Sequence, residues 1–162
     1  MVRTVALCAA LSVVLLASGC GFRLQVESAL PEGVQRVHVA TRDELSAFAV
    51  ELGRGLEGLG AQRAASPGEA DAVIRIQKDR AGRRVLSVSA RNTPQEYEVF
   101  YQVEYSIDRG GQEVVPTQPL ELTRNFSFDE SRLLAKDHEE EILRDAMARD
   151  LADLVLRRLG SL

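Results

Sequence analysis

The chain has 162 residues, of which 45% are hydrophobic, and its net charge is −4 at pH 7. This length fits one domain with a single core, and the mildly acidic balance argues against a nucleic-acid-binding scaffold. Both cysteines, Cys8 and Cys20, lie in or beside an amino-terminal leader, so the composition excludes a fold held together by disulfides.

Residues 1–19 have the pattern of a bacterial lipoprotein signal peptide. Arg3 precedes an apolar run that starts at Val5, and two small residues then lead into Cys20. The run is about 15 residues long, whereas a transmembrane helix, which is the alternative interpretation, needs roughly 20. We therefore expect cleavage before Cys20 and attachment of lipid to its thiol.

The mature chain is expected to stay at a membrane surface without crossing it. Two or more acyl chains anchor a protein durably, and Gly21 stands where an acidic residue would favour retention in the inner membrane. This favours the periplasmic side of the outer membrane. Residues 20–32 are expected to form a lipidated tether, and residues 33–162 a single domain that depends on packing alone.

The domain is predicted to begin with a strand and a helix. Residues 34–40 alternate between apolar and polar side chains, which indicates a strand. Thr41 and Glu44 match a capping box, and apolar residues then recur at helical spacing from Leu45 to Leu59. Gly60 suits the position after the end of a helix.

A run of strands follows. Residues 71–78 and 84–91 are predicted as strands separated by a turn at residues 79–82, and Asn92–Pro94 is a second turn. Residues 96–108 show the strongest alternation in the chain, which predicts a strand with one covered face and one wet face.

The last third contains a hairpin, a strand and a helix. Arg109–Gly111 closes the hairpin, and the strand after Pro116 and Pro119 places Leu120, Leu122, Phe126 and Phe128 on one face. A helix is predicted from Asp137 to about Leu159, because its buried stripe recurs at helical spacing and its charges oppose the helix dipole. The stripe comprises Leu143, Met147, Leu151, Leu154 and Val155.

The order β-α-β-β-β-β-α predicts an α+β fold. Two amphipathic helices bury their apolar faces when both pack on one face of a sheet, which gives a two-layer sandwich. The sheet is expected to be mostly antiparallel with four to five strands. The first and second strands would be parallel neighbours joined through the first helix.

The usual signatures of catalysis or cofactor binding are weak in this sequence. Gly53, Gly55 and Gly58 spell a dinucleotide-binding fingerprint, but they lie deep in the predicted helix and not at its start. His138, with Asp137 and Glu141, could hold a metal ion, although a solvated acidic helix start explains these residues better. No serine lies in a nucleophile elbow. We expect no enzymatic activity, no cofactor and no metal, and a tethered hydrolase is the least favoured alternative.

Three basic residues near the predicted strand and helix ends are candidates for phosphate recognition. They are Arg91, Arg124 and Lys136. Arginine binds phosphate through a fork of donors and lysine as a point charge, but surface solubility and helix capping explain the three residues better when each is taken alone.

Four motifs, in this order, resemble the LptE family of lipopolysaccharide-assembly lipoproteins. They are Cys20–Leu24, Glu96–Glu98, Arg124–Asp129 and Leu134–Asp137. The resemblance implies two helices on a mostly antiparallel sheet, a place inside the lumen of the outer-membrane barrel LptD, and binding of lipopolysaccharide. In the family, basic residues matching Arg91 and Lys136 are implicated in that binding. The other interpretation is a generic envelope-assembly or interaction module.

Overall fold

The computed structural model describes residues 29–127 and 133–162, and the side chains of residues 126–137 fall outside the description. The expected signal peptide, Cys20 and most of the tether therefore lie outside the described residues. The elements are β1 (Arg36–Ala40), α2 (Ala47–Gly58), β2 (Gln62–Arg63), the short 3-10 helix η1 (Pro67–Glu69), β3 (Ala72–Val88), β4 (Pro94–Arg109), β5 (Gln112–Ser127) and α3 (Leu133–Gly160).

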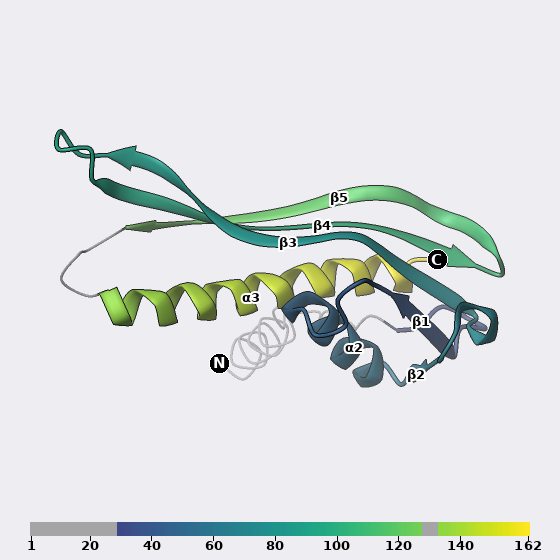
Figure 1. Cartoon of the computed structure of the whole chain (residues 1–162). Helices are drawn as coiled ribbons and strands as arrows, with labels where there is room; N and C mark the ends of the chain where they lie inside the picture. Colours follow the sequence, from purple (N-terminus) through teal and green to yellow (C-terminus); the bar gives the residue numbers. More distant parts are fainter. Residues whose placement is uncertain (1–28, 128–132) are drawn as a thin grey trace, which may run out of the picture.

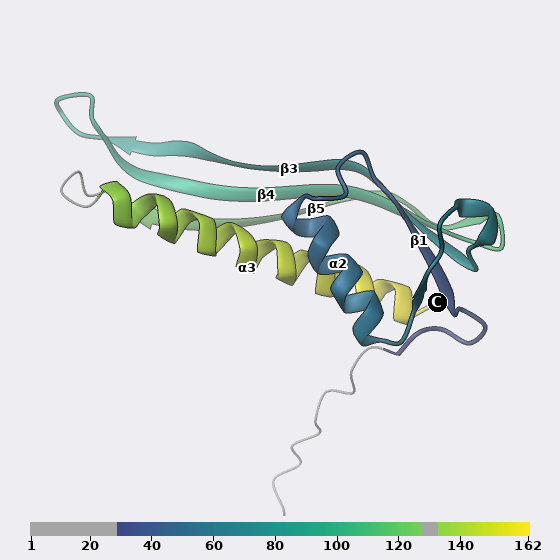
Figure 2. The ribbon, with the colours of Figure 1, turned by 60° about the horizontal axis from the view of Figure 1, so that its bottom comes forward.

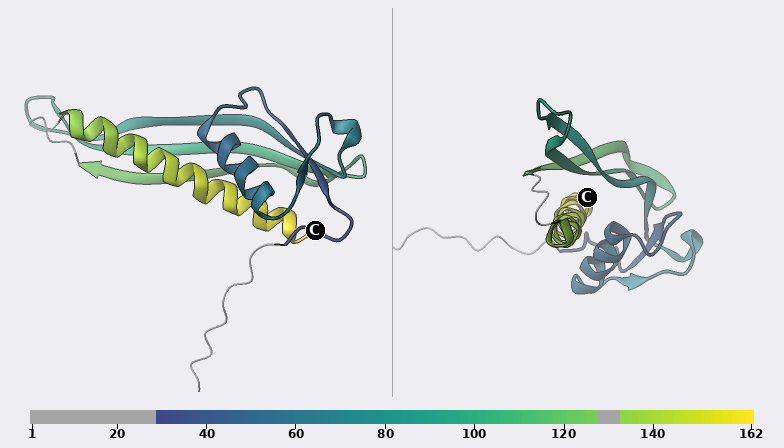
Figure 3. Two further views of the ribbon diagram at one scale, coloured as in Figure 1. Left: turned by 90° about the horizontal axis from the view of Figure 1, so that it is seen from below. Right: turned by 60° about the vertical axis from the view of Figure 1, so that its left-hand side comes forward.

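The five strands form one sheet in the order β2-β1-β3-β4-β5. β1 is parallel to both β2 and β3, while the β3–β4 and β4–β5 pairs are antiparallel. Both helices lie on the same face of the sheet, with α3 along the three long strands and α2 beside it (Figures 1 and 3). The predicted α+β sandwich is confirmed, including the parallel pairing of the strands on either side of the first helix.

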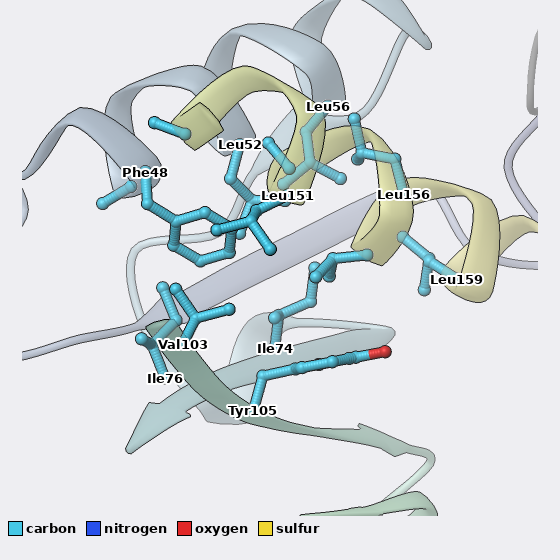
Figure 4. Packing of buried hydrophobic residues seen from close by; sticks show 14 of the residues in the cluster. Phe48, Leu52, Leu56, Ile74, Ile76, Val103, Tyr105, Leu151, Leu156 and Leu159 are labelled. Atoms are coloured by element: carbon cyan, nitrogen blue, oxygen red, sulfur yellow. The ribbon is translucent and has the colours of Figure 1, made fainter. Parts of the chain in front are cut away.

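The core lies between the sheet and the two helices (Figure 4). β4 sends alternate side chains into it, and Val99, Tyr101, Val103, Tyr105 and Ile107 are all buried as the alternation predicted. From the helices come Phe48 and Leu52 of α2 together with Met147, Leu151, Val155 and Leu159 of α3, each with almost no exposed surface.

The two helices approach closely at Gly55. A Cβ atom added at this position would overlap Cδ1 of Leu156 on α3. Gly53 and Gly58 have no such neighbour, since nothing lies within 4 Å of an added Cβ. Only one of the three glycines in α2 is therefore needed for packing.

The predicted turn at residues 79–82 is wrong, because β3 runs without a break from Ala72 to Val88. Residues 79–82 pair in regular register with residues 103–100 of β4, and the nearest register shift lies before them, between Ile76 and Lys78. Gly82 lies opposite Phe100, and an added Cβ would come within 2.8 Å of the ring. The glycine therefore leaves room for the aromatic ring on the neighbouring strand, and the chain does not reverse its direction there.

The predicted capping box is also wrong. The N-cap of α2 is Ser46, whose Oγ accepts a hydrogen bond from the amide of Ala49 at 3.1 Å. Thr41 Oγ1 instead accepts from the amide of Asp43 in the preceding loop. At the other end, Gly60 has φ +81°, and the amides of Gly60 and Ala61 bond to carbonyls of the last helical turn, as expected.

The remaining differences concern ends and edges. β2 was not predicted, and β5 includes both prolines, which an edge strand tolerates because one side of its backbone faces away from the ladder. α3 begins at Leu133, one turn earlier than expected, so the acidic residues lie after its first turn. Leu154 is exposed and Leu143 is half-buried, whereas Met147, Leu151 and Val155 of the predicted stripe are buried. Across the described ranges, no helix is long and apolar enough to span a membrane.

Candidate functional site

One end of the molecule combines two segments that are distant in sequence. The turn between β3 and β4 projects past the helices, and the start of α3 lies at the same end (Figures 1 and 3). We call residues 84–96 together with the first turn of α3, residues 133–136, the distal end. Arg91 lies in the hairpin turn and Lys136 is the fourth residue of α3, so the structure brings together the two segments that carry these candidates.

The hairpin turn is held by Ser89. Its amide donates to the carbonyl of Thr93 at 2.7 Å, and its Oγ accepts from the amides of Arg91 and Thr93 at 3.3 and 3.2 Å. Asn92 completes the turn in the left-handed region with φ 59°, which asparagine tolerates better than most residues. The side chain of Arg91 is exposed, and no described carboxylate lies within ion-pair distance of it.

Exposed apolar side chains lie on the strand that leads into this turn. Val85, Leu86 and Val88 of β3 are 48%, 48% and 53% exposed. The hairpin extends beyond the part of the sheet that the helices cover (Figure 2), so neither face of it is fully buried. The distal end thus offers exposed apolar side chains and an exposed positive charge.

A buried carboxylate joins the hairpin to α3. Glu140 is nearly inaccessible, and its side chain binds Arg83 of β3 at 3.0 Å and Arg144 one turn further along α3. The guanidinium of Arg83 also lies over the ring of Tyr97, 5.4 Å from its centroid. The base of the hairpin is therefore fixed to the helix by one acid and two arginines.

The opposite face of the hairpin carries a second arginine cluster. Arg84 binds Glu98 and Glu121, and it lies with Arg80 over the ring of Phe100, at 5.1 and 5.6 Å from the centroid. Arg84 donates hydrogen bonds to Glu98, which has the larger effect, and to Glu121, and these bonds raise the pKa of Arg84 above its ordinary value. These contacts stiffen the three strands where the sheet leaves the helices.

The other predicted residues are placed as follows. Arg124 of β5 pairs with Asp150 of α3 at 3.5 Å. Asp150 is 14 residues further along α3 than Lys136, or about 21 Å along the helix axis. Arg124 is therefore not brought together with the distal end, and its role in phosphate binding stays a prediction. The side chain of Lys136 and all of Cys20 lie outside the described part.

The histidines lie apart from one another. His38 Nδ1 is 2.9 Å from the carbonyl oxygen of Ala64, and His138 lies 3.7 Å from Glu141 on an exposed helix surface. No cluster of three or more potential metal ligands occurs among residues 29–127 and 133–162, side chains 126–137 excepted. The glycine fingerprint lies inside α2, away from the helix start that would be needed to hold a phosphate.

The sequence interpretation missed Arg83 and Glu140. The available signal was the density of basic residues along β3 and the turn after it, since Lys78, Arg80, Arg83, Arg84 and Arg91 lie within 14 positions. The acidic partners of Lys78, Arg83 and Arg84 are 14 to 57 residues away in sequence, so local patterns could not pair them.

Together the fold and the distal end define an elongated two-layer α+β domain with a projecting hairpin that carries exposed basic and apolar residues. The chain belongs to the LptE family, described as lipopolysaccharide-assembly, because the sequence model of that family matches residues 34–159. No curated protein sequence matches the chain.

Solved structures of similar proteins share the fold. The solution structure of an uncharacterized lipoprotein B from Nitrosomonas europaea has 28% identity and a TM-score of 0.73, and covers 87% of this chain and 91% of its own. Rare lipoprotein B from Shewanella oneidensis has 24% identity and a TM-score of 0.68, with 78% and 95% covered. A minor lipoprotein from Acinetobacter baumannii has 18% identity and a TM-score of 0.64, with 79% and 92% covered.

Proposed function

We propose that this protein is an outer-membrane lipoprotein, anchored through Cys20 on the periplasmic side, that assists assembly of the LptD barrel and occupies its lumen. The observation that carries the proposal is the match of the LptE family over nearly the whole described domain. The protein acts by binding and not as an enzyme, and it takes part in delivering lipopolysaccharide to the cell surface.

The face of the sheet that the helices do not cover is compatible with the lumen of a barrel. The interior of a large outer-membrane barrel is polar. Along this face the side chains form ion pairs, Arg75–Asp108 at 2.8 Å and Lys78–Glu104 at 3.2 Å, so the surface is polar but largely neutralised. A domain with such a face can fill a polar lumen without burying unpaired charge.

Co-purification tests this part of the proposal. We expect the mature protein to co-elute with LptD after detergent extraction of outer membranes, and its depletion to lower the lipopolysaccharide exposed at the cell surface. Separate elution of the two proteins, together with normal surface lipopolysaccharide after depletion, would contradict the proposal.

The distal end is proposed to contact lipopolysaccharide. The ligand combines phosphate groups with acyl chains, and the distal end combines the exposed Arg91, and Lys136 in the first turn of α3, with Val85, Leu86 and Val88. Arginine and lysine would bind phosphate, and the three aliphatic side chains would lie against the lipid.

A pair of charge-reversed variants tests this contact. Arg91→Glu with Lys136→Glu should reduce binding of purified lipopolysaccharide at least tenfold, with little change in the melting temperature. Arg42→Glu with Arg157→Glu is the matched control, because both residues are exposed and lie outside the distal end, and the change in net charge is the same. Equal losses in the two double variants would mean that net charge, and not this site, controls binding.

A further inference from the structure

A second surface feature lies at the other side of the molecule from the distal hairpin. A pocket of about 330 Å³ opens between α2, β1 and β2, at the edge of the sheet. Its walls are mostly aliphatic and include Val39, Ala49, Val50 and Ala61. The pocket is large enough for one or two apolar side chains, and the proposed lipopolysaccharide contact does not involve it.

The domain's own side chains leave this pocket open. Gly53 forms part of the wall, and a Cβ added there would meet no atom within 4 Å. Leu45 stands at the rim with 88% of its surface exposed, and its amide is bound by the side chain of Asp43 at 3.0 Å. A large leucine in water beside an open apolar wall is surface that an additional apolar group could cover.

The two arginines of the pocket wall already have acidic partners, whereas Glu57 of the same wall has no basic partner among the described ion pairs. Arg63 binds Glu44 at 3.0 Å, and Arg54 binds Glu51 at 2.8 Å. A charged head group would therefore find no free counter-charge in these arginines. The pocket favours an uncharged apolar occupant, such as the side chains of a polypeptide segment.

The chain itself supplies such a segment just before the described domain. Phe22, Leu24 and Val26 alternate with the polar residues Arg23, Gln25 and Glu27. Because the apolar residues occur at every second position, their three side chains would lie on one side of an extended chain.

The described chain begins six residues before Gln35, a residue that is hydrogen-bonded to the pocket wall. Leu30 packs against the core, and the carbonyl of Gln35 accepts from the amide of Gln62, a residue of the pocket wall, at 2.8 Å. Leu24 is five residues before Ala29 and can lie up to about 17 Å from it in an extended chain.

We propose that residues 22–26 bind in this pocket and cover Leu45, with Phe22 and Leu24 against the wall formed by Ala49, Val50 and Gly53. Bound in this way, the segment holds Cys20 beside α2 and β2. If Cys20 carries lipid, as the proposed function requires, the domain then has a fixed orientation, with the α2–β2 side towards the anchoring membrane. Binding of the segment itself does not depend on lipopolysaccharide transport.

The pocket offers a matched pair of variants. Gly53→Leu would fill it, whereas Gly58→Leu makes the same change five residues later in α2 at a position that is equally open but does not line the pocket. Leucine favours helix more than glycine does, so neither change should unfold α2.

The test uses the chain from residue 20 on and a double-mutant cycle. In the parent chain and in Gly58→Leu, we expect Phe22→Ser with Leu24→Ser to lower the melting temperature by several degrees. In Gly53→Leu the same pair should have almost no effect, because the segment is already displaced. Equal effects in all three backgrounds, or no effect in any, would overturn the proposal.

A label on Cys20 gives a second, independent measurement. Cys20 is the single cysteine of the chain from residue 20 on, so a nitroxide can be attached to it specifically. We expect the methyl signals of Val39 and Val50 to be broadened at least threefold more in the parent and Gly58→Leu than in Gly53→Leu. Equal broadening in the three proteins would overturn the proposal.

Discussion

At the scale of single residues, the three glycines of α2 show how one residue type can serve different purposes. Gly55 lies where α2 crosses α3, and Leu156 occupies the space that a side chain would need. Gly53 and Gly58 face open space. The sequence indicated either a weak helix or a close approach of backbones, and the structure assigns the close approach to Gly55 alone.

Gly55→Ala should therefore destabilise the protein by about 1–2 kcal/mol, because the added methyl group overpacks the buried Leu156. Gly58→Ala should leave stability unchanged or raise it by up to about 1 kcal/mol, since alanine restricts the unfolded chain and favours helix. Urea unfolding measures both changes. Similar effects of the two substitutions would show that the helices can separate at Gly55 without cost.

Asp71 fixes the start of β1. Its carboxylate accepts hydrogen bonds from the amides of Arg36 at 2.8 Å and Gln35 at 3.1 Å, and it also pairs with the Arg36 guanidinium. These bonds, those from the backbone first, hold the pKa of Asp71 below its ordinary value. A lowered pKa means that the ionised form stabilises the folded state.

The stabilisation by Asp71 should be complete above the unfolded-state pKa of about 3.9 and should be lost as the pH falls through the lower folded-state value. We therefore expect Asp71→Asn to lower the melting temperature at pH 7, and the gap to the parent protein to narrow below pH 4. Melting curves between pH 2 and pH 7 measure the gap, with Asp153→Asn on the exposed side of α3 as the control. A gap that stays constant across this range would contradict the assignment.

At the scale of elements, long-range partners decided the boundaries that local patterns did not predict. Thr41 and Glu44 have the spacing of a capping box, but the cap is Ser46, which also donates a hydrogen bond to Asp79 at 2.5 Å. Asp79 lies 33 residues away on β3. A rule based on neighbours three residues apart cannot detect this contact, so the start of α2 was placed too early.

Ser46→Ala should cost about 0.5–2 kcal/mol, the usual range for loss of an N-cap, because it removes the bond to the amide of Ala49 and leaves Asp79 without its hydroxyl partner. Thr41→Ala removes a bond inside an exposed loop and should cost much less. Chemical denaturation of the two variants distinguishes the observed cap from the predicted one. A larger loss for Thr41→Ala would support the predicted capping box after all.

The sequence predicted best those elements whose cause is local. The alternation of β4 and the glycines at 110 and 111, both with positive φ, led directly to a strand and a hairpin. The prediction of a turn at residues 79–82 was wrong because Gly82 pairs with Phe100 on the neighbouring strand. Arg91 was predicted at the end of a strand and lies in the turn that follows, because β3 ends at Val88. The partnership of Arg83 with Glu140 depends on how α3 lies against the sheet.

At the scale of the whole molecule, the domain is a long sheet whose outer part extends beyond most of its core. The buried side chains from both helices gather where α2 and α3 overlap, and the hairpin projects from there past the start of α3 (Figures 1 and 2). Contacts outside the core must therefore hold the hairpin. Glu140, with Arg83 and Arg144, is the contact best placed to do so.

Glu140→Gln should loosen the hairpin without unfolding the domain. The amide keeps the shape of the side chain but loses the charge that two arginines share, and both arginines are exposed enough to be solvated afterwards. We expect amide hydrogen exchange at residues 83–97 to accelerate at least about tenfold, equal to about 1.4 kcal/mol, while the core strand positions 101–107 keep their protection.

Glu141→Gln is the control, because Glu141 is one residue away but exposed and contacts only His138 in the described ion pairs. If exchange rises equally in both variants, or equally along all of β4, the hairpin is held by the sheet itself and not by the helix. If the prediction is met, Glu140→Gln provides a further test of lipopolysaccharide binding. The proposed contact residues are unchanged in this variant, but the hairpin is less well ordered.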